Sequence, residues 1–178
     1  KEGIYTMKIT LKDGSFKEYE SSMAVIDIAK DISEGLARVA TAAKVNGELV
    51  DLRTVVDADA ELEILTFDSE DGKGAFNHTA AHIMAQAVKK LWPEAKLAIG
   101  PAIDNGFYYD FDCEHKFGEE DFQKIQKEMK RIVQANYPLE RFELPREEAI
   151  KFMEERQEPY KVELIQDLPE DAVISFYK

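Results

Sequence analysis

Residues 41–52 have the sequence Thr-Ala-Ala-Lys-Val-Asn-Gly-Glu-Leu-Val-Asp-Leu, in which two strand-like runs flank Asn46-Gly47. An Asn-Gly pair between two such runs is a strong hairpin signal, because both residues tolerate the positive φ of a tight turn. An earlier hairpin is predicted around Asp13-Gly14, from residues 7–11 and 16–19. The beginning of the chain therefore predicts a small antiparallel framework.

A short amphipathic helix is predicted from Val25 to Ile32, and Gly35 lies just past it as a helix stop. Residues 61–67 alternate between apolar and polar side chains, as a half-buried strand does. This order of hairpin, helix and short strands favours a small sheet with one helix across its face. We assign it to a first domain, residues 1–67.

Residues 68–74 are polar, contain two glycines and lack large apolar side chains, so they predict a linker or hinge. The remaining residues, 75–178, form a second segment with both helix and strand patterns. Its predicted helices are at 75–92, 119–133 and 146–156, and its predicted strands are at 97–100, 106–112, 141–144 and 173–177. Both segments mix helices with short strands, so the fold class is α+β.

Two elements of the second segment have a defined apolar side. In residues 106–112, alternation places Phe107, Tyr109 and Phe111 on one face of the strand. The long helix carries an apolar stripe and has acidic residues in its first turn and basic residues in its last turn, as the helix dipole prefers. The stripe consists of Phe122, Ile125, Met129, Ile132 and Val133, and the last turn contains Lys130 and Arg131.

Composition excludes several classes of protein. The 178 residues are 44% apolar and 33% charged, which is typical of a soluble globular chain. No run of about 18 apolar residues predicts a membrane span, and Lys1 to Thr10 contain no apolar signal region. The net charge of −13 argues against RNA binding by electrostatics alone. Cys113 has no intrachain partner, which fits a reducing cytosol, so we expect a cytoplasmic protein.

His78 and His82 are the main chemical signal. They stand four residues apart in the predicted helix, so both side chains point the same way. Small neighbours such as Ala81 and Ala85 leave room for a ligand to approach. The same spacing also fits two histidines on a polar helix face without a chemical role. Thr79 stands where a zinc protease requires Glu, which argues against that class.

Other possible sites are weaker. Cys113 and His115 could share one face of a strand, but a metal site needs at least three ligands, so we interpret both as ordinary loop residues. Lys73 lies between two glycines, but the Walker phosphate-loop pattern is absent, so we expect no ATP site. Lys161 is of interest only if the fold places it beside the histidines. Asp104, Asp110 or Asp112 could orient a histidine, and the sequence does not choose among them.

Taken together, residues 78–88, 91–93, 99–110 and 45–52 resemble sequences of the threonyl-tRNA synthetases. Residues 78–88 and 91–93 resemble the HxxxH helix of that family, and residues 99–110 are similar to the sequence that follows it in bacterial enzymes. Residues 45–52 resemble the middle of the family's N-terminal TGS domain. The resemblance spans nearly the whole chain in the right order.

The resemblance implies a β-grasp, ubiquitin-like TGS domain followed by an α+β editing domain that is truncated at its C-terminal end. The parent enzyme would ligate threonine to tRNA(Thr) with ATP, and its editing domain would hydrolyse mischarged seryl-tRNA(Thr). The family's second half-site, Asp-x-Cys-Arg-Gly-Pro-His, is absent after Tyr177. The chain is thus expected to hold half of an editing site.

The resemblance also implies residue roles. His78 and His82 match the catalytic histidines, and Lys161, within Tyr160-Lys161-Val162, matches a lysine of the substrate pocket. No cofactor is expected in this chain, because ATP and zinc belong to the missing catalytic core; a metal held by His78 and His82 is a weaker alternative. The expected partners are the acceptor end of tRNA(Thr) bearing serine and a second subunit bound through the missing core. The competing hypothesis is a non-catalytic TGS module for RNA or protein interaction.

Overall fold

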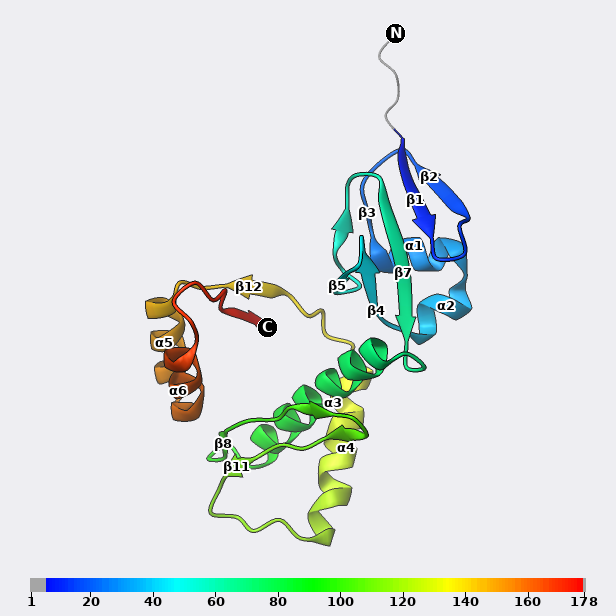
Figure 1. The fold of residues 1–178 in the computed structure, drawn as a ribbon. Coiled ribbons are helices and arrows are strands. Elements are labelled where there is room, and N and C mark those ends of the chain that lie inside the picture. The colour runs from blue at the N-terminus through cyan, green and yellow to red at the C-terminus, as the bar shows by residue number, and fades with distance from the viewer. Residues whose placement is uncertain (1–5, 178) are drawn as a thin grey trace. The chain divides into compact units, whose positions relative to one another are not determined.

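The computed structural model describes residues 6–177 (Figure 1). Residues 1–5, at the start of the first predicted domain, and Lys178, the end of the second, lie outside the described residues. By their contacts the described residues form two compact units, one ending at Asn77 and the other beginning at His78. Each unit combines helices with short strands, so the predicted α+β class is confirmed.

The first unit is built on a five-stranded sheet in the order β2-β1-β7-β4-β5. Strands β1 and β7 are parallel, and the other neighbouring strands are antiparallel. The turn between β4 and β5 has positive φ at both Asn46 (51°) and Gly47 (83°), as its sequence predicts. The strands are β1 (Met7–Leu11), β2 (Phe16–Tyr19), β4 (Ala40–Val45), β5 (Glu48–Val50) and β7 (Ala60–Thr66).

Helix α1 (Val25–Ile32) packs on this sheet (Figure 1). The small strands β3 (Met23–Ala24) and β6 (Val55–Val56) pair beside it. The core joins helix and sheet through Met7, Ile9, Val25, Ile28, Ala43, Val56 and Leu62, all of which are buried.

The predicted stop at Gly35 is wrong. The first helix ends at Ile32, and a second helix, α2 (Glu34–Val39), contains Gly35. Ser33 has an extended backbone between the two helices, and its Oγ accepts hydrogen bonds from the backbone N–H groups of Gly35 and Leu36. Ser33 is a good N-cap, so it both interrupts the first helix and starts the next.

The predicted linker is largely helical, which corrects the start of the next element. Helix α3 (Glu70–Leu91) begins five residues before the predicted Ala75. Ser69 Oγ accepts from the backbone N–H of Gly72 at 3.2 Å, and Asp71 forms an ion pair with Lys44 of β4 at 2.6 Å. Thr41 Oγ1 donates to the carbonyl of Gly72 at 2.8 Å. These contacts with β4 hold the polar segment in a helical turn, which its composition alone does not indicate.

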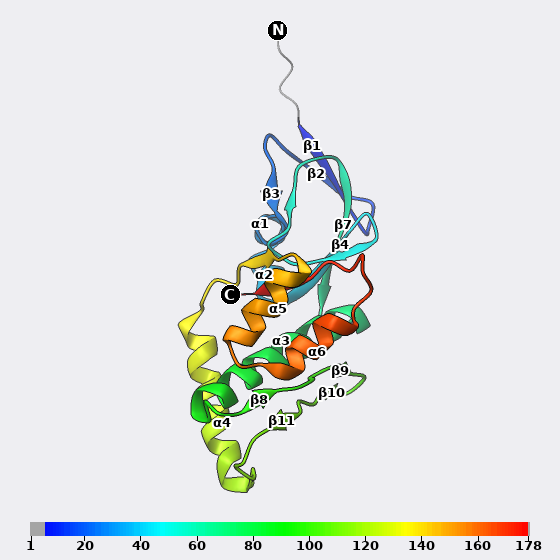
Figure 2. The same cartoon turned by 90° about the vertical axis from the view of Figure 1, so that its left-hand side faces the viewer.

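The second unit contains a long irregular hairpin, residues 96–112, with β9 (Ala102–Ile103) and β10 (Gly106–Phe107) toward its tip (Figure 2). Nearer its base, β8 (Lys96–Leu97) pairs with β11 (Phe111–Asp112). The predicted continuous strand over 106–112 is therefore wrong. Leu97 faces Phe111 and Ala102 faces Phe107, so four residues (98–101) on one side lie opposite three (108–110) on the other. Pro101 also has no N–H to donate to a strand ladder.

Helix α4 (Glu119–Ala135) is long, as predicted, but its buried side is not the predicted apolar stripe. Its buried residues are Asp121 and Glu128, whereas Phe122 and Val133 are 61% and 60% exposed. The helix also continues past Lys130 and Arg131, so its last turn contains no basic residue. Ion pairs neutralise both buried carboxylates, which allows polar residues to occupy the packed side.

The C-terminal part forms a small second core in which α5 (Arg146–Glu155) packs against α6 (Pro159–Asp167). Strands β12 (Arg141–Glu143) and β13 (Ser175–Tyr177) pair beside them. Helix α6 is not among the predicted elements. Pro159 at its first turn and the buried Ile165 are its sequence signals.

Candidate functional site

Helix α3 brings His78 and His82 into direct contact. Their Nε2 atoms lie 3.1 Å apart, and their rings are nearly perpendicular at a centroid distance of 4.5 Å. Both side chains are exposed, whereas Ala81 and Ala85 are buried, so the helix packs through alanines and presents imidazoles at its surface. In such a pair one neutral imidazole donates its Nε2–H to the Nε2 of the other.

The surroundings of His82 favour its neutral form. Although His82 is exposed at the surface, surrounding protein atoms remove part of its ring from water, and this desolvation lowers its pKa from the ordinary value. The nearby charges of His78 and Lys161 lower the pKa further. A neutral imidazole at pH 7 can accept a proton or a hydrogen bond from water. His82 is thus suited to act as a general base or to hold a water molecule.

Lys161 lies in the same unit, on α6. Its Nζ donates to the carbonyl of Ala98 at 2.8 Å and to the Tyr109 hydroxyl at 3.3 Å. Burial lowers the pKa of Lys161, and the charge of Glu158 opposes that effect. The positive charge of Lys161 also lowers the pKa of His82. The catalytic and binding roles of the three residues stay predictions.

The TGS domain family matches residues 7–66, which are the sheet and helices of the first unit. Threonine–tRNA ligases from Acetivibrio thermocellus and Clostridium acetobutylicum are each 63% identical over 172 residues. The ligase from Clostridioides difficile is 57% identical over the same length. It is the N-terminal region of these ligases that the chain matches. The chain is thus similar to one part of the threonine–tRNA ligases.

The matches cover 97% of this chain but only 27% of each of these relatives, so the chain spans about a quarter of the length of the curated ligases. The β-grasp expectation for the first unit is confirmed by the TGS match. Within residues 6–177, no helix is long and apolar enough to cross a membrane.

Two residues that contact or act on Lys161 are missed by sequence reasoning. Tyr109 is predicted only as an apolar face residue, but its hydroxyl accepts from Lys161, and burial raises its pKa. Its ring stacks on Phe111 at a centroid distance of 4.9 Å, as the predicted shared face implies. Glu158 carries no sequence signal except its place before Pro159, yet it is buried beside Lys161.

The acidic candidates fall into two groups. Asp112 accepts a hydrogen bond from the Tyr160 hydroxyl at 2.9 Å and lies 3.9 Å from Lys96 Nζ. Asp104 and Asp110 are exposed. Asp112 therefore links the hairpin to α6 through Tyr160, the residue before Lys161.

Cys113 and His115 contact different partners. Cys113 Sγ lies 3.8 Å from Glu94, whereas His115 Nε2 lies 2.7 Å from the buried carboxylate of Asp121. The His115 ring also stacks on Trp92 at 4.8 Å. Across residues 6–177, no group of three or more His, Cys, Asp or Glu is arranged to hold a metal ion. The pair is integrated into local packing.

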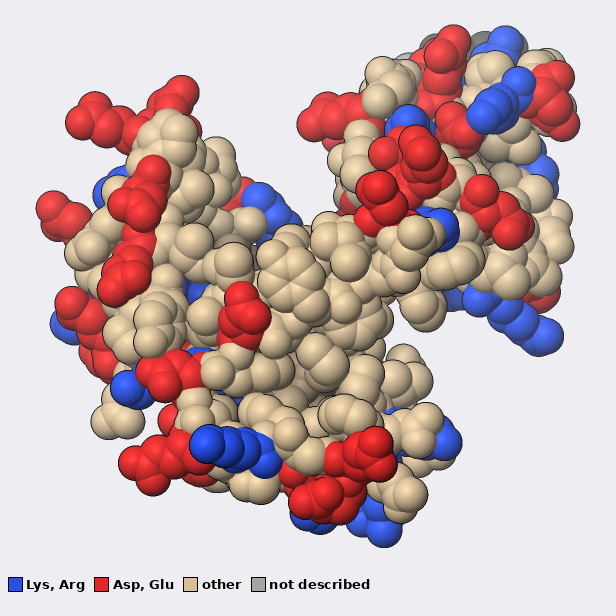
Figure 3. Space-filling model, turned by 60° about the horizontal axis from the view of Figure 1, so that its bottom comes forward, with Lys and Arg blue, Asp and Glu red and all other residues tan. Residues whose placement is uncertain are grey.

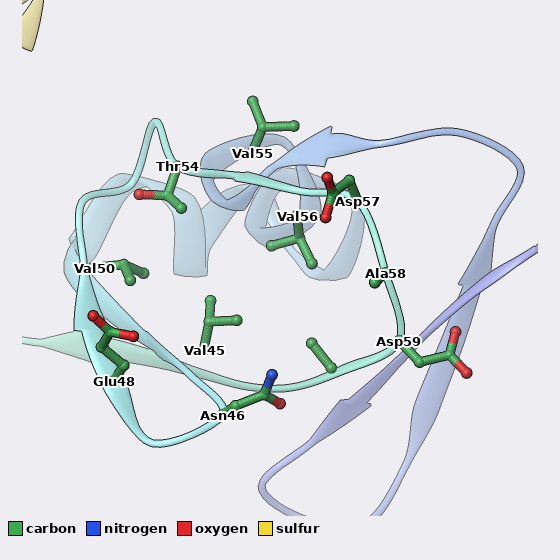
Figure 4. Close-up of a pocket in the computed structure, with 11 residues that line it drawn as sticks. Val45, Asn46, Glu48, Val50, Thr54, Val55, Val56, Asp57, Ala58 and Asp59 are labelled. Atoms are coloured by element: carbon green, nitrogen blue, oxygen red, sulfur yellow. The ribbon is translucent and has the colours of Figure 1, made fainter.

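A hollow in the TGS domain contains none of the predicted site residues (Figure 4). Several valines are among the residues that line it, and so are the acidic residues Glu48, Asp57 and Asp59. It has no histidine, cysteine or lysine, so it offers no base or nucleophile comparable to those of the second unit.

Proposed function

We propose that residues 75–178 are the first part of an editing domain, and that they contribute to hydrolysis of seryl-tRNA(Thr) in a threonine–tRNA ligase. The parent enzyme would ligate threonine to tRNA(Thr) with ATP. The observation that carries the proposal is the contact between His78 and His82, with Lys161 nearby, in a region similar to these ligases.

Such an activity answers a limit of binding specificity. Serine lacks one methyl group of threonine, and one such group gives only about 10–200-fold discrimination in a binding pocket. An enzyme that attaches threonine therefore also attaches some serine. A second site that hydrolyses the wrong ester corrects the error after attachment.

In the proposed reaction, water attacks the carbonyl carbon of the seryl ester. The bond between that carbon and the ribose oxygen breaks, and the ribose oxygen takes up a proton. His82 is the better candidate for the base or water holder, because its lowered pKa keeps it neutral at pH 7; such assistance is worth about 10²–10⁴-fold. The Lys161 ammonium would hold the substrate or stabilise the developing oxyanion.

The partners follow from the same proposal. Acidic side chains are spread over the visible surface, consistent with the net charge of −13 (Figure 3). The remaining ligase would therefore hold the tRNA body, form the homodimer and bind ATP and zinc, while this region receives the acceptor end in the cytoplasm. A metal held by His78 and His82 is a second mechanism, but two ligands are fewer than the three protein ligands of catalytic zinc.

The competing function is a non-catalytic TGS module. Its support is the TGS match itself, because a TGS domain alone does not identify an enzyme. The two functions differ in one observable, which is whether changes in the second unit alter hydrolysis of seryl-tRNA.

The test uses a full-length threonine–tRNA ligase that carries this region. His78→Ala, His82→Ala and Lys161→Ala should each slow hydrolysis of seryl-tRNA(Thr) and leave threonylation unchanged. Gln86→Ala is the matched control, because Gln86 is exposed on α3 one turn beyond His82. Unchanged hydrolysis in both histidine variants would exclude the editing proposal and favour the interaction module. A chelator that abolishes hydrolysis would favour the metal mechanism.

A further inference from the structure

We propose that Glu158 is a positioning residue that fixes Lys161 in the site by joining α6 to the end of α3 and to strand β8. The role of Lys161 toward substrate rests on the proposed function, whereas the placement of Lys161 by Glu158 does not.

Glu158 uses both carboxylate oxygens, although only 6% of the residue is exposed. Oε2 accepts from the backbone N–H of Leu97 at 2.9 Å, and Oε1 pairs with Lys89 Nζ at 2.7 Å. Leu97 belongs to β8 and Lys89 to the last turn of α3. One buried carboxylate thus joins three elements. Removal of a partner would leave an unpaired buried charge, which strongly destabilises a folded protein.

The same residue begins the helix that carries Lys161. Glu158 is the N-cap of α6, and its carbonyl oxygen accepts from the backbone N–H of Lys161 at 3.1 Å. Lys161 Nζ in turn donates to the carbonyl of Ala98, the residue after Leu97. Glu158 and Lys161 therefore hold two adjacent residues, Leu97 and Ala98, on the same side of the hairpin.

Electrostatics adds a second link. Lys161 Nζ contacts the neutral acceptors on Ala98 and Tyr109, and its charge lowers the pKa of His82 on α3. The carboxylate of Glu158 acts on Lys161 itself. Burial lowers the pKa of Lys161, and Glu158 is the negative charge that raises it. Loss of that charge should let Lys161 release its proton at lower pH.

The experiment compares two variants that break the same ion pair from opposite sides. Glu158→Gln removes the charge that raises the pKa of Lys161, whereas Lys89→Gln breaks the pair but keeps that charge. Glu163→Gln removes an exposed carboxylate from the same helix and is the control for net charge. The Lys161 side chain of the 178-residue protein is titrated by NMR with ¹³C-labelled lysine, and its resonance is assigned with Lys161→Arg.

We expect the Lys161 midpoint to move to lower pH in Glu158→Gln, but not to lower pH in Lys89→Gln or Glu163→Gln. In the full-length ligase, Glu158→Gln should slow seryl-tRNA hydrolysis by up to about a hundredfold, the cost of a misplaced group, and the alkaline limb of its pH profile should move the same way.

An unchanged Lys161 midpoint in folded Glu158→Gln would overturn the inference, as would equal shifts in Glu158→Gln and Lys89→Gln. A shifted midpoint without any change in hydrolysis would support the placement of Lys161 by Glu158, and would instead count against a role of Lys161 in editing.

Discussion

The ring of Tyr109 lies directly against Gly100, across the hairpin formed by β8 and β11. A Cβ atom at position 100 would overlap Cδ2 and Cε2 of that ring. The backbones are paired here as well, because the N–H of Asp110 donates to the carbonyl of Ile99 at 2.8 Å. Gly100 therefore allows the ring to cover the strand with its hydroxyl beside Lys161.

Gly100→Ala should displace the Tyr109 ring and remove one acceptor from Lys161. Overpacking of this kind costs about 1–3 kcal/mol in the free energy of unfolding. We expect seryl-tRNA hydrolysis to fall by up to about a hundredfold while threonylation persists. Urea unfolding and single-turnover hydrolysis measure the two effects.

Gly74→Ala is the contrasting substitution. Gly74 lies within α3, and a Cβ atom there would meet no other atom within 4 Å. Alanine in a helix is favoured over glycine by about 0.5–1 kcal/mol, so this variant should be slightly more stable and hydrolyse normally. Equal losses in both glycine variants would contradict a specific role of Gly100.

The parts of the fold that follow from sequence are those with local causes. Asn46-Gly47 fixes a turn by its own backbone preferences, and the apolar spacing of Val25 to Ile32 is that of a helix wherever it packs. The helical start at residues 70–74 depends on Lys44 and Thr41, which lie about thirty residues earlier in the chain. Ser69 and the acidic first turn are local signals for a helix start, but the contacts with β4 cannot be read from the local sequence.

The candidate site also has one part that follows from local sequence and another that depends on packing between distant segments. The contact between His78 and His82 follows from their spacing on one helix. Lys161 acts on His82 only because α6 packs against the side of the hairpin that includes Ala98, 63 residues away. Tyr109 and Glu158 become site residues through that packing alone, so their types and spacing do not reveal them.

His82 should titrate at lower pH than an ordinary histidine, and His78→Ala should raise its midpoint by removing a neighbouring positive charge. The pKa of His82 in the folded protein lies below its unfolded value of about 6.5, so protonation opposes folding. Its contribution is constant above that value, and stability falls as the pH drops from there toward the folded pKa. Imidazole NMR measures the midpoint, with the His115 resonances as an internal reference; an unshifted midpoint in His78→Ala would show that the two rings do not interact.

The core of the TGS domain should be sensitive to Ile28→Ala. Ile28 on α1 is fully buried against the sheet, and such a truncation costs about 2–5 kcal/mol. Hydrogen exchange of the β7 amides, measured in the whole chain, should accelerate in this variant. Val39→Ala, at a position that is 56% exposed, should change the free energy of unfolding by less than about 0.5 kcal/mol. Similar effects at the two positions would mean that α1 does not carry the core.

Acid stability of the second unit should depend on Asp121. This fully buried carboxylate accepts from the N–H of Gly118 at 3.1 Å and contacts Lys124 at 2.9 Å and His115 at 2.7 Å. Lys124, His115 and Gly118, in that order, hold the pKa of Asp121 well below its usual range. Its stabilising contribution is therefore complete above about pH 4, the ordinary pKa of an aspartate, and is lost as the pH falls from there toward the folded pKa.

Asp121→Asn should lower the melting temperature at pH 7 and flatten the loss of stability below pH 4, whereas Asp167→Asn, at an exposed position on α6, should do neither. Thermal unfolding of the three proteins between pH 2 and 7 measures this, and parallel curves for Asp121→Asn and the wild type would contradict it.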